Sequence, residues 1–250
     1  MPNRRSMTML GALCTLLGAM FTGPAQAQFL PGGVGGAYVR GDLGWSSASD
    51  AQIVDKDFAT DGFIFNSAGT GPGELNDIGS SYVVGIGVGG RISPLFRGDI
   101  VYSYRGGYEL SDTDQFGDAF ASDITSQSIM ANIYWDLPFA MSGFSPFVGA
   151  GIGWAGNKMH EVLTVDGGTF FLPEGTASNL AWQLMGGLSF PISPQINVDL
   201  FYRYFDGGKL QTEEGIAFTD TGASAGLYTG MRGDLTAHEI MLSFRFAFGP

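Results

Sequence analysis

Cysteine and charge are both scarce in this sequence. The 250 residues include one cysteine, Cys14, and 14% charged residues, whereas about 25% is usual in a globular domain. After the first segment, no run approaches the ~18 consecutive apolar residues of a transmembrane helix. These absences argue against disulfide bonds, thiol chemistry and a helical membrane protein in the mature chain.

Basic residues are also few, with 12 Lys and Arg against 24 Asp and Glu. Two of these arginines lie in the first segment, where a basic start precedes an apolar run from Met7 to Phe21. Ala25-Gln26-Ala27 then resembles a cleavage site, so we expect residues 1–27 to be a signal peptide for Sec-type export. The mature chain, residues 28–250, then has a net charge of −14. This charge argues against a nucleic-acid partner, which would need a basic face.

Strict alternation of apolar and other residues is abundant instead. The run from His238 to Phe248 has Ile240, Leu242, Phe244, Phe246 and Phe248 on one side. The residues between them are polar or small, which is typical of a β-strand with two different environments. Seven earlier segments also alternate: 37–46, 81–92, 96–107, 127–137, 147–157, 180–192 and 196–205.

The connections between these segments alternate in length. Tight turns surround Pro94 and Pro194, and residues 138–146 make a moderate connection. The other four connections are long: 47–80, 108–126, 158–179 and 206–234. Short turns at one end and long loops at the other are typical of bacterial outer-membrane barrels. We therefore predict an all-β fold, an eight-stranded antiparallel up-and-down transmembrane β-barrel over residues 28–250 with four long extracellular loops. A soluble lipocalin-like barrel is the alternative.

Aromatic residues on the apolar faces gather near the strand ends. At the long-loop end these are Trp45, Tyr82, Tyr104, Trp154, Trp182 and Tyr204. At the short-turn end they are Trp135, Phe246 and Phe248. Amphipathic rings at two depths predict membrane-interface girdles, with outer-membrane lipid around the barrel.

The polar strand faces carry nearly balanced charge. We expect a lumen charge network of Arg40, Asp42, Arg91, Arg97, Asp99, Arg105, Asp136, Asp199, Arg203, Glu239 and Arg245. Side chains fill an eight-stranded barrel, so these charges need partners there. Glycines at 85, 87, 89, 149, 151 and 153 are expected to leave room for the arginines. An ion or proton path is the alternative to this packed polar core.

Several motifs resemble those of the small outer-membrane β-barrel surface antigens, the opacity-type and OmpA-type barrels. They are Gly41–Gly44 (GDLG), Asn132–Leu137 (NIYWDL), Pro146–Gly153 (PFVGAGIG) and Tyr202–Tyr204 (YRY). The resemblance covers the whole mature chain. It implies insertion into the bacterial outer membrane by the barrel-assembly machinery, which would read the aromatic last strand.

Motifs for chemistry are weak. Gly85–Gly90 matches G-x-G-x-x-G but lies within a strand and does not open a helix, as a dinucleotide site requires. Asp55, Asp57 and Asp61 lack the terminal Glu of a calcium-binding EF-hand loop. Neither His160 nor His238 has Ser two residues further on, as a base-nucleophile pair on one strand face would require. We therefore expect no catalytic residue, metal or cofactor.

The loops carry a net charge of −15, so the strands are nearly neutral and the loops account for the net charge of the mature chain. They also contain apolar residues, such as Phe63 to Phe65, that either bind a partner or pack within the loops. We expect a structural or interaction role, like that of an adhesin or surface antigen, with lipopolysaccharide or an extracellular partner at the loops. A narrow channel for small solutes and a lipid-modifying enzyme are the alternatives.

Overall fold

The computed structural model describes residues 36–49, 53–56, 78–113, 119–138, 143–160, 162–164, 170–218, 224–228 and 230–248. The chain divides into two units, Met1–Gly35 and Gly36–Pro250. All the described residues belong to the second unit, so the predicted signal peptide at 1–27 lies outside them. Among the described residues, no helix is long and apolar enough to cross a membrane.

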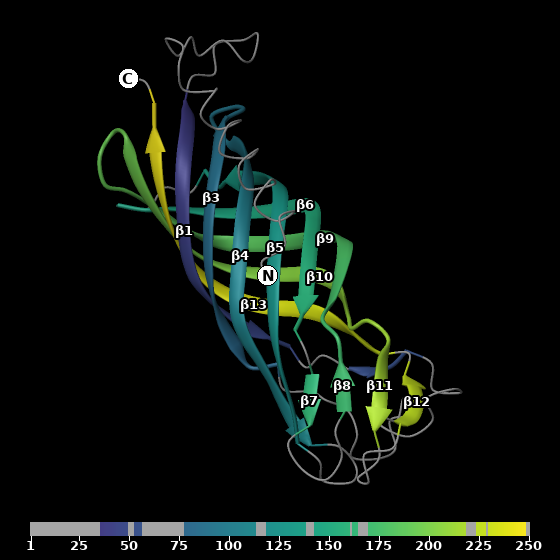
Figure 1. Cartoon of the computed structure of the whole chain (residues 1–250). Helices are drawn as coiled ribbons and strands as arrows, with labels where there is room; N and C mark the ends of the chain where they lie inside the picture. Colours follow the sequence, from purple (N-terminus) through teal and green to yellow (C-terminus); the bar gives the residue numbers. More distant parts are fainter. Residues whose placement is uncertain are drawn as a thin grey trace. The chain divides into compact units, whose positions relative to one another are not determined.

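Eight long antiparallel strands form the wall of a closed barrel (Figure 1). They are β1 (Ala37–Ala48), β3 (Ser80–Arg91), β4 (Phe96–Thr113), β5 (Ala119–Asp136), β6 (Ser145–Met159), β9 (Gly175–Pro191), β10 (Ile196–Gln211) and β13 (Met231–Ala247). Each strand pairs with the next one in this order. The last strand, β13, then pairs with β1, where Tyr38 lies opposite Ala247 and Ala48 opposite Ala237. The predicted eight-stranded up-and-down barrel is confirmed, and no edge is left in this wall.

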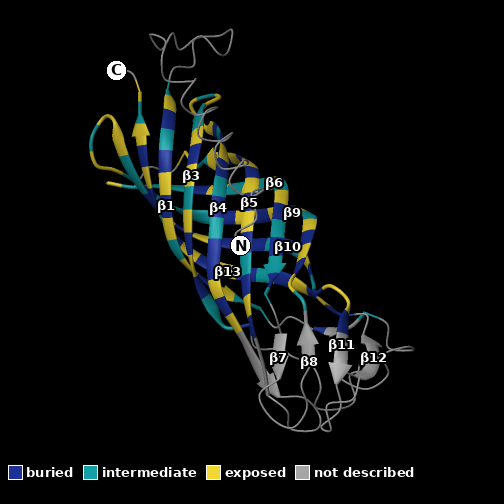
Figure 2. Ribbon diagram, viewed as in Figure 1, coloured by how far each residue is buried: buried dark blue, intermediate teal, exposed yellow. Residues whose placement is uncertain are grey.

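Exposed and buried residues alternate along these strands (Figure 2), and the exposed ones include many large apolar side chains, whereas the buried ones include most of the arginines. On β13, Ile240 is 57% exposed and Phe244 is 53% exposed. Glu239, Met241, Ser243 and Arg245, which alternate with them, are buried. Because side chains alternate along a strand, the sequence pattern places its apolar face on the outside of the barrel.

The two tight turns have the same hydrogen bonds. Ile92 N donates to Phe96 O over 2.8 Å, and Ile192 N donates to Ile196 O over 2.9 Å. In each turn the hydroxyl of the serine before proline also accepts a backbone N–H, that of Phe96 or of Ile196, over 3.1 Å. A serine hydroxyl that bonds nearby backbone in this way stabilises a tight turn.

Five of the strands, β4, β5, β9, β10 and β13, run at least five residues further toward the long-loop end than the sequence predicted. On β4 and β10 a bulge explains the error, because the register shifts between Arg105 and Tyr108 and again between Asp206 and Gly208. The bulges contain Gly107 and Gly208, whose φ angles are +84° and +71°. An extra residue reverses the alternation of inward and outward side chains, so the pattern we followed stops there.

The other three extended strands, β5, β9 and β13, lose the outward apolar face without a bulge. On β13, Arg232 and Asp234 point outward, whereas Met231 and Leu235 are buried. Here the outward side chains are polar and the inward ones apolar, whereas between Ile240 and Phe246 the outward side chains are apolar. Polar outward side chains are usual in a strand that faces water. On β5, Asp123 is exposed and Ser122 is buried, so both faces of that stretch carry polar residues.

Five short strands lie within the segments that we expected to be unstructured loops. They are β2 (Val54–Asp55), β7 (Val162–Thr164), β8 (Phe170–Leu172), β11 (Gly215–Phe218) and β12 (Ser224–Tyr228). β2 pairs with β13, and β7, β8, β11 and β12 continue the sheet from β5 in that order. The apolar residues Phe63 to Phe65 lie outside the described residues.

Apolar side chains fill the interior near the long-loop end. Ile53 and Ile78 come from the two ends of the first long connection, and they are 0% and 1% exposed. The other buried apolar residues of these extensions are Tyr108, Ile124, Met159, Leu210, Met231 and Leu235. We call these eight residues the apolar cap. They bury both ends of the first long connection, which we had predicted as an extracellular loop.

Candidate functional site

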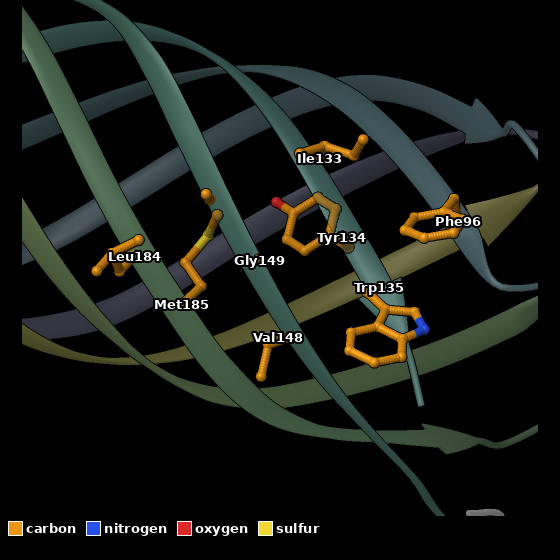
Figure 3. Close-up of a pocket in the computed structure, with 9 residues that line it drawn as sticks. Phe96, Ile133, Tyr134, Trp135, Val148, Gly149, Leu184 and Met185 are labelled. Atoms are coloured by element: carbon orange, nitrogen blue, oxygen red, sulfur yellow. The ribbon is translucent and has the colours of Figure 1, made fainter. Parts of the chain in front are cut away.

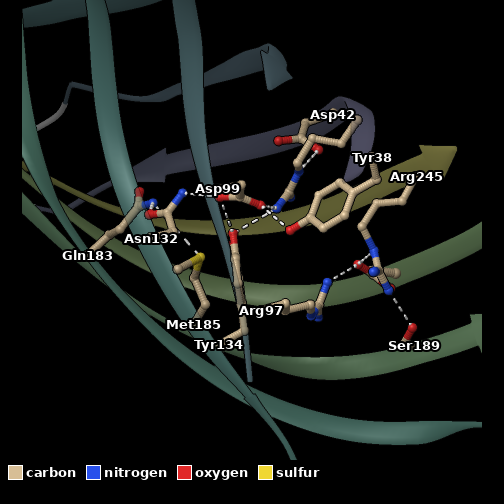
Figure 4. Close-up of polar contacts among 12 residues, drawn as sticks. Tyr38, Asp42, Arg97, Asp99, Asn132, Tyr134, Gln183, Met185, Ser189 and Arg245 are labelled. Atoms are coloured by element: carbon tan, nitrogen blue, oxygen red, sulfur yellow. Dashed lines mark hydrogen bonds and ion pairs between the residues drawn. The ribbon is translucent and has the colours of Figure 1, made fainter. Parts of the chain in front are cut away.

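The barrel interior holds three clusters of charged residues, which we name by their distance from the short turns. In the lower cluster, Asp199 of β10 accepts from two arginines. Arg245 donates to it from Nε over 2.7 Å and from Nη2 over 2.9 Å. Arg97 donates from Nη1 over 3.1 Å and also reaches Asp136 from Nε over 3.0 Å. In Figure 4 the guanidinium groups of Arg97 and Arg245 point toward each other.

The middle cluster is centred on Arg40 and Asp99. Arg40 donates from Nε to Asp42 over 2.9 Å and from Nη1 to Asp99 over 2.8 Å. Asp99 also accepts from the hydroxyl of Tyr38 over 3.1 Å and from the amide of Asn132 over 2.8 Å (Figure 4). Its carboxylate is therefore fully surrounded by donors, as a buried charge requires.

The upper cluster has one carboxylate and two arginines. Arg105 donates from Nε to Glu239 over 2.7 Å, and Arg203 donates from Nε to the other oxygen of the same carboxylate. Ser46 donates to Glu239 over 3.0 Å, and Arg105 also donates to Ser128 over 3.0 Å. The carboxylate therefore joins β1, β4 and β10 to β13 across the interior.

Aromatic rings lie over Arg97 and Arg105, the two arginines whose Nη2 atoms have no hydrogen-bond partner among the described residues. The guanidinium carbon of Arg97 lies 4.5 Å from the ring centres of both Tyr134 and Phe147. That of Arg105 lies 3.5 Å from the ring centre of Phe205. A guanidinium is attracted to an aromatic face at such distances, and Lys would fit these sites less well.

Ten of the eleven predicted lumen residues form these clusters, and Arg91 touches only the outer edge of the lower one. Arg91 lies at the end of β3, its side chain is 44% exposed, and it pairs with Asp136 over 3.3 Å. It therefore marks the rim at the short-turn end rather than the buried interior. Alternation predicted that Arg91 lies on the inward face, but it could not show that the residue lies at the rim, where its side chain is exposed.

Uncharged members of the clusters were missed by the sequence analysis. Tyr38, Asn132, Tyr134 and Gln183 all lie on the inward faces and contribute hydrogen bonds to the middle cluster. Alternation alone placed them on that face. We considered only charged residues, although a buried carboxylate also needs neutral donors.

The inward-facing glycines leave room for several kinds of side chain, and only one of them lies against an arginine. A Cβ on Gly87 would lie 3.1 Å from Cγ of Arg40. At Gly89 and Gly149 the nearest side-chain atoms include those of Tyr38 and Tyr134. The expectation that these glycines accommodate arginines is therefore too narrow, because the tyrosine rings need the space as well.

The aromatic residues predicted for the long-loop end lie on the outward face. Trp45 is opposite Tyr82 in the β1–β3 pair, and the rings of Tyr82 and Tyr104 are 6.4 Å apart. The rings of Trp182 and Tyr204 are 5.3 Å apart, and the Trp182 indole donates to Asp206 over 3.1 Å. Trp154 is also exposed on this face.

At the short-turn end the outward aromatic residues form pairs. Trp135 stacks on Phe96 with ring centres 6.5 Å apart, and Phe246 lies 5.4 Å from Phe248. The backbone N–H of Phe248 donates to Ala37 O over 2.8 Å, which ties the end of β13 to the start of β1. Their role as a girdle stays a prediction.

Lys158, near the long-loop end of β6, forms an ion pair with Glu174, which precedes β9. The two groups are 2.6 Å apart, and both are partly exposed. The hydrogen bond from Lys158 lowers the pKa of Glu174 below its usual value. An exposed pair of this kind has little effect on stability.

The two histidines lie apart from the clusters. His238 points outward, where its ring contacts the Tyr202 hydroxyl and lies 5.4 Å from the ring of Tyr204. His160 follows β6, and its backbone N–H donates to Asp123 O over 2.8 Å. Within the described residues, neither imidazole is hydrogen-bonded to a Ser, Thr or Cys side chain, and no group of three or more His, Cys, Asp and Glu could hold a metal ion.

A family model described as the outer membrane protein beta-barrel domain matches residues 12–246. The chain belongs to this outer-membrane β-barrel family. Its place is therefore the bacterial outer membrane, with the apolar outward face of the barrel in lipid. The predicted localisation is confirmed.

Curated relatives of this outer-membrane barrel include proteins from two bacterial genera. An uncharacterized protein of Brucella abortus is 26% identical over 210 residues, which cover 68% of this chain and 67% of the relative. The outer membrane protein PagN of Salmonella typhimurium is 23% identical over 224 residues, which cover 85% of this chain and 90% of PagN.

Solved structures similar to this outer-membrane barrel include Neisserial surface protein A. It has a TM-score of 0.45 and 17% identity, with 84% of this chain and 96% of that chain covered. The outer membrane protease OmpT from Escherichia coli has a TM-score of 0.49 and 9% identity, with 89% of this chain and 100% of that chain covered.

Proposed function

We propose that this outer-membrane barrel is a closed, non-conducting surface protein that acts through contact with an extracellular partner at its long-loop end. The observation that carries the proposal is the filled interior. Arg97, Arg105 and Arg203 are almost completely buried, and each is paired with a carboxylate. A wide pore would instead leave its lining charges in water.

The apolar cap supports the same reading. Ile53 and Ile78 bring the ends of the first long connection into the interior, beyond the upper charge cluster. The cap adds an apolar layer to the charged ones along the axis of the barrel. Ions crossing the barrel would have to displace both layers, so the channel is the less favoured function.

The strand extensions provide a base for a binding surface. β4 and β5 remain paired as far as Thr113 and Ala119, beyond the outward aromatic residues. Lys56 is held to β13 and to the end of β10, because its N–H donates to Gly230 O over 2.8 Å and its Nζ to Thr212 O over 2.5 Å. A surface on such a paired base loses less conformational entropy on binding than a surface on free loops.

Single-channel recording in planar lipid bilayers tests the closed barrel. We expect the purified, folded protein to give no steady conductance, because the interior is filled. A stable current of porin size from the parent protein would contradict the proposal and favour the channel.

A binding assay tests the role of the long-loop end. Bacteria that display the protein would be applied to cultured epithelial cells and to immobilised extracellular-matrix proteins. The test variant replaces residues 57–77 with a short Gly/Ser linker and keeps the buried Ile53 and the anchored Lys56. The control replaces residues 139–142, between β5 and β6 at the short-turn end.

We expect the first replacement to reduce binding and the control to leave it unchanged at equal surface levels. Absence of binding by the parent protein, or equal binding by both variants, would count against an interaction role for this segment.

A further inference from the structure

We draw no further inference here: the strongest candidate, the groove of about 450 Å³ on the outward apolar face of β5, β6 and β9 (Figure 3), belongs to the surface that lies in lipid, and nothing in the structure shows which molecule covers it.

Discussion

Asp199 is the carboxylate that the two arginines of the lower cluster share. It accepts from Arg245 over 2.7 Å and from Arg97 over 3.1 Å, and its side chain is 1% exposed. Both arginines are buried too, so bulk water could not solvate their guanidinium groups if the carboxylate were removed. The loss of this one group therefore affects two charges at once.

We predict that Asp199→Ala lowers the free energy of unfolding by roughly 3–5 kcal/mol, the cost of leaving buried charge unpaired. Arg91→Ala is the matched control. It removes a partner of Asp136 in the same part of the barrel, but its side chain is 44% exposed, and the expected cost is below about 1 kcal/mol. The measurement is urea unfolding of the protein in lipid vesicles, followed by tryptophan fluorescence. Equal stability of the two variants would show that the interior is wet and its pairs weak.

At the scale of strands, the bulges on β4 and β10 exchange which side chains point into the barrel and which point outward. On β4, Arg105 is the last inward residue before the bulge, and Tyr108 is the first after it. The bulge therefore changes the interior from charged to apolar within a few residues.

We predict that Gly107→Ala costs roughly 1–2 kcal/mol of stability, because its φ of +84° places a side chain in the left-handed region. A Cβ there would meet no atom within 4 Å, so the effect comes from the backbone alone. Gly156→Ala is the control: it also has open space, but its φ is not positive. Denaturant unfolding compares the two, and a Gly107→Ala variant as stable as Gly156→Ala would contradict the assigned bulge.

The end of β13 is the part of the sheet that we expect the assembly machinery to read. Phe246 and Phe248 are both exposed on the outward face. Replacing both with Asp puts charge in or near the hydrocarbon, at a cost of up to a few kcal/mol that depends on depth. We predict loss of assembled protein at the cell surface, measured by surface labelling. Replacing both with Leu should preserve the apolar face and isolate any need for aromatic rings, and normal levels of the Asp variant would reject the prediction.

At the scale of the whole molecule, closure of the sheet makes the barrel a single cooperative unit. The ladder from β1 through β13 leaves no free edge in the wall, and hydrogen bonds in lipid must be satisfied within the protein. We predict that the exported protein begins at Gln28 and that its folded form migrates faster than the boiled form on a gel. N-terminal sequencing of the outer-membrane fraction checks the first point. A mature chain that retains residues 1–27 would contradict the predicted signal peptide.

The sequence by itself determined the number of barrel strands, their order and the direction of each face. This was possible because alternation is local: Ile240 and Met241 point to opposite sides whatever lies around them. The lipid exterior reverses the usual rule, and aromatic residues such as Trp45 and Trp135 indicated that reversal. The balance of arginines and carboxylates also followed from the inward faces, before any pairing was known.

Only the tertiary structure decided which charges meet. Arg97 and Asp199 are 102 positions apart, and Arg105 and Glu239 are 134 apart, so their contact depends on closure of the sheet and on its register. The strand extensions were also hidden, because a bulge reverses the alternation at Gly107 and because the outward residues of β13 before His238 are polar. The burial of Ile53 was hidden as well, because the adjoining β2 pairs with β13, which lies far away in the sequence.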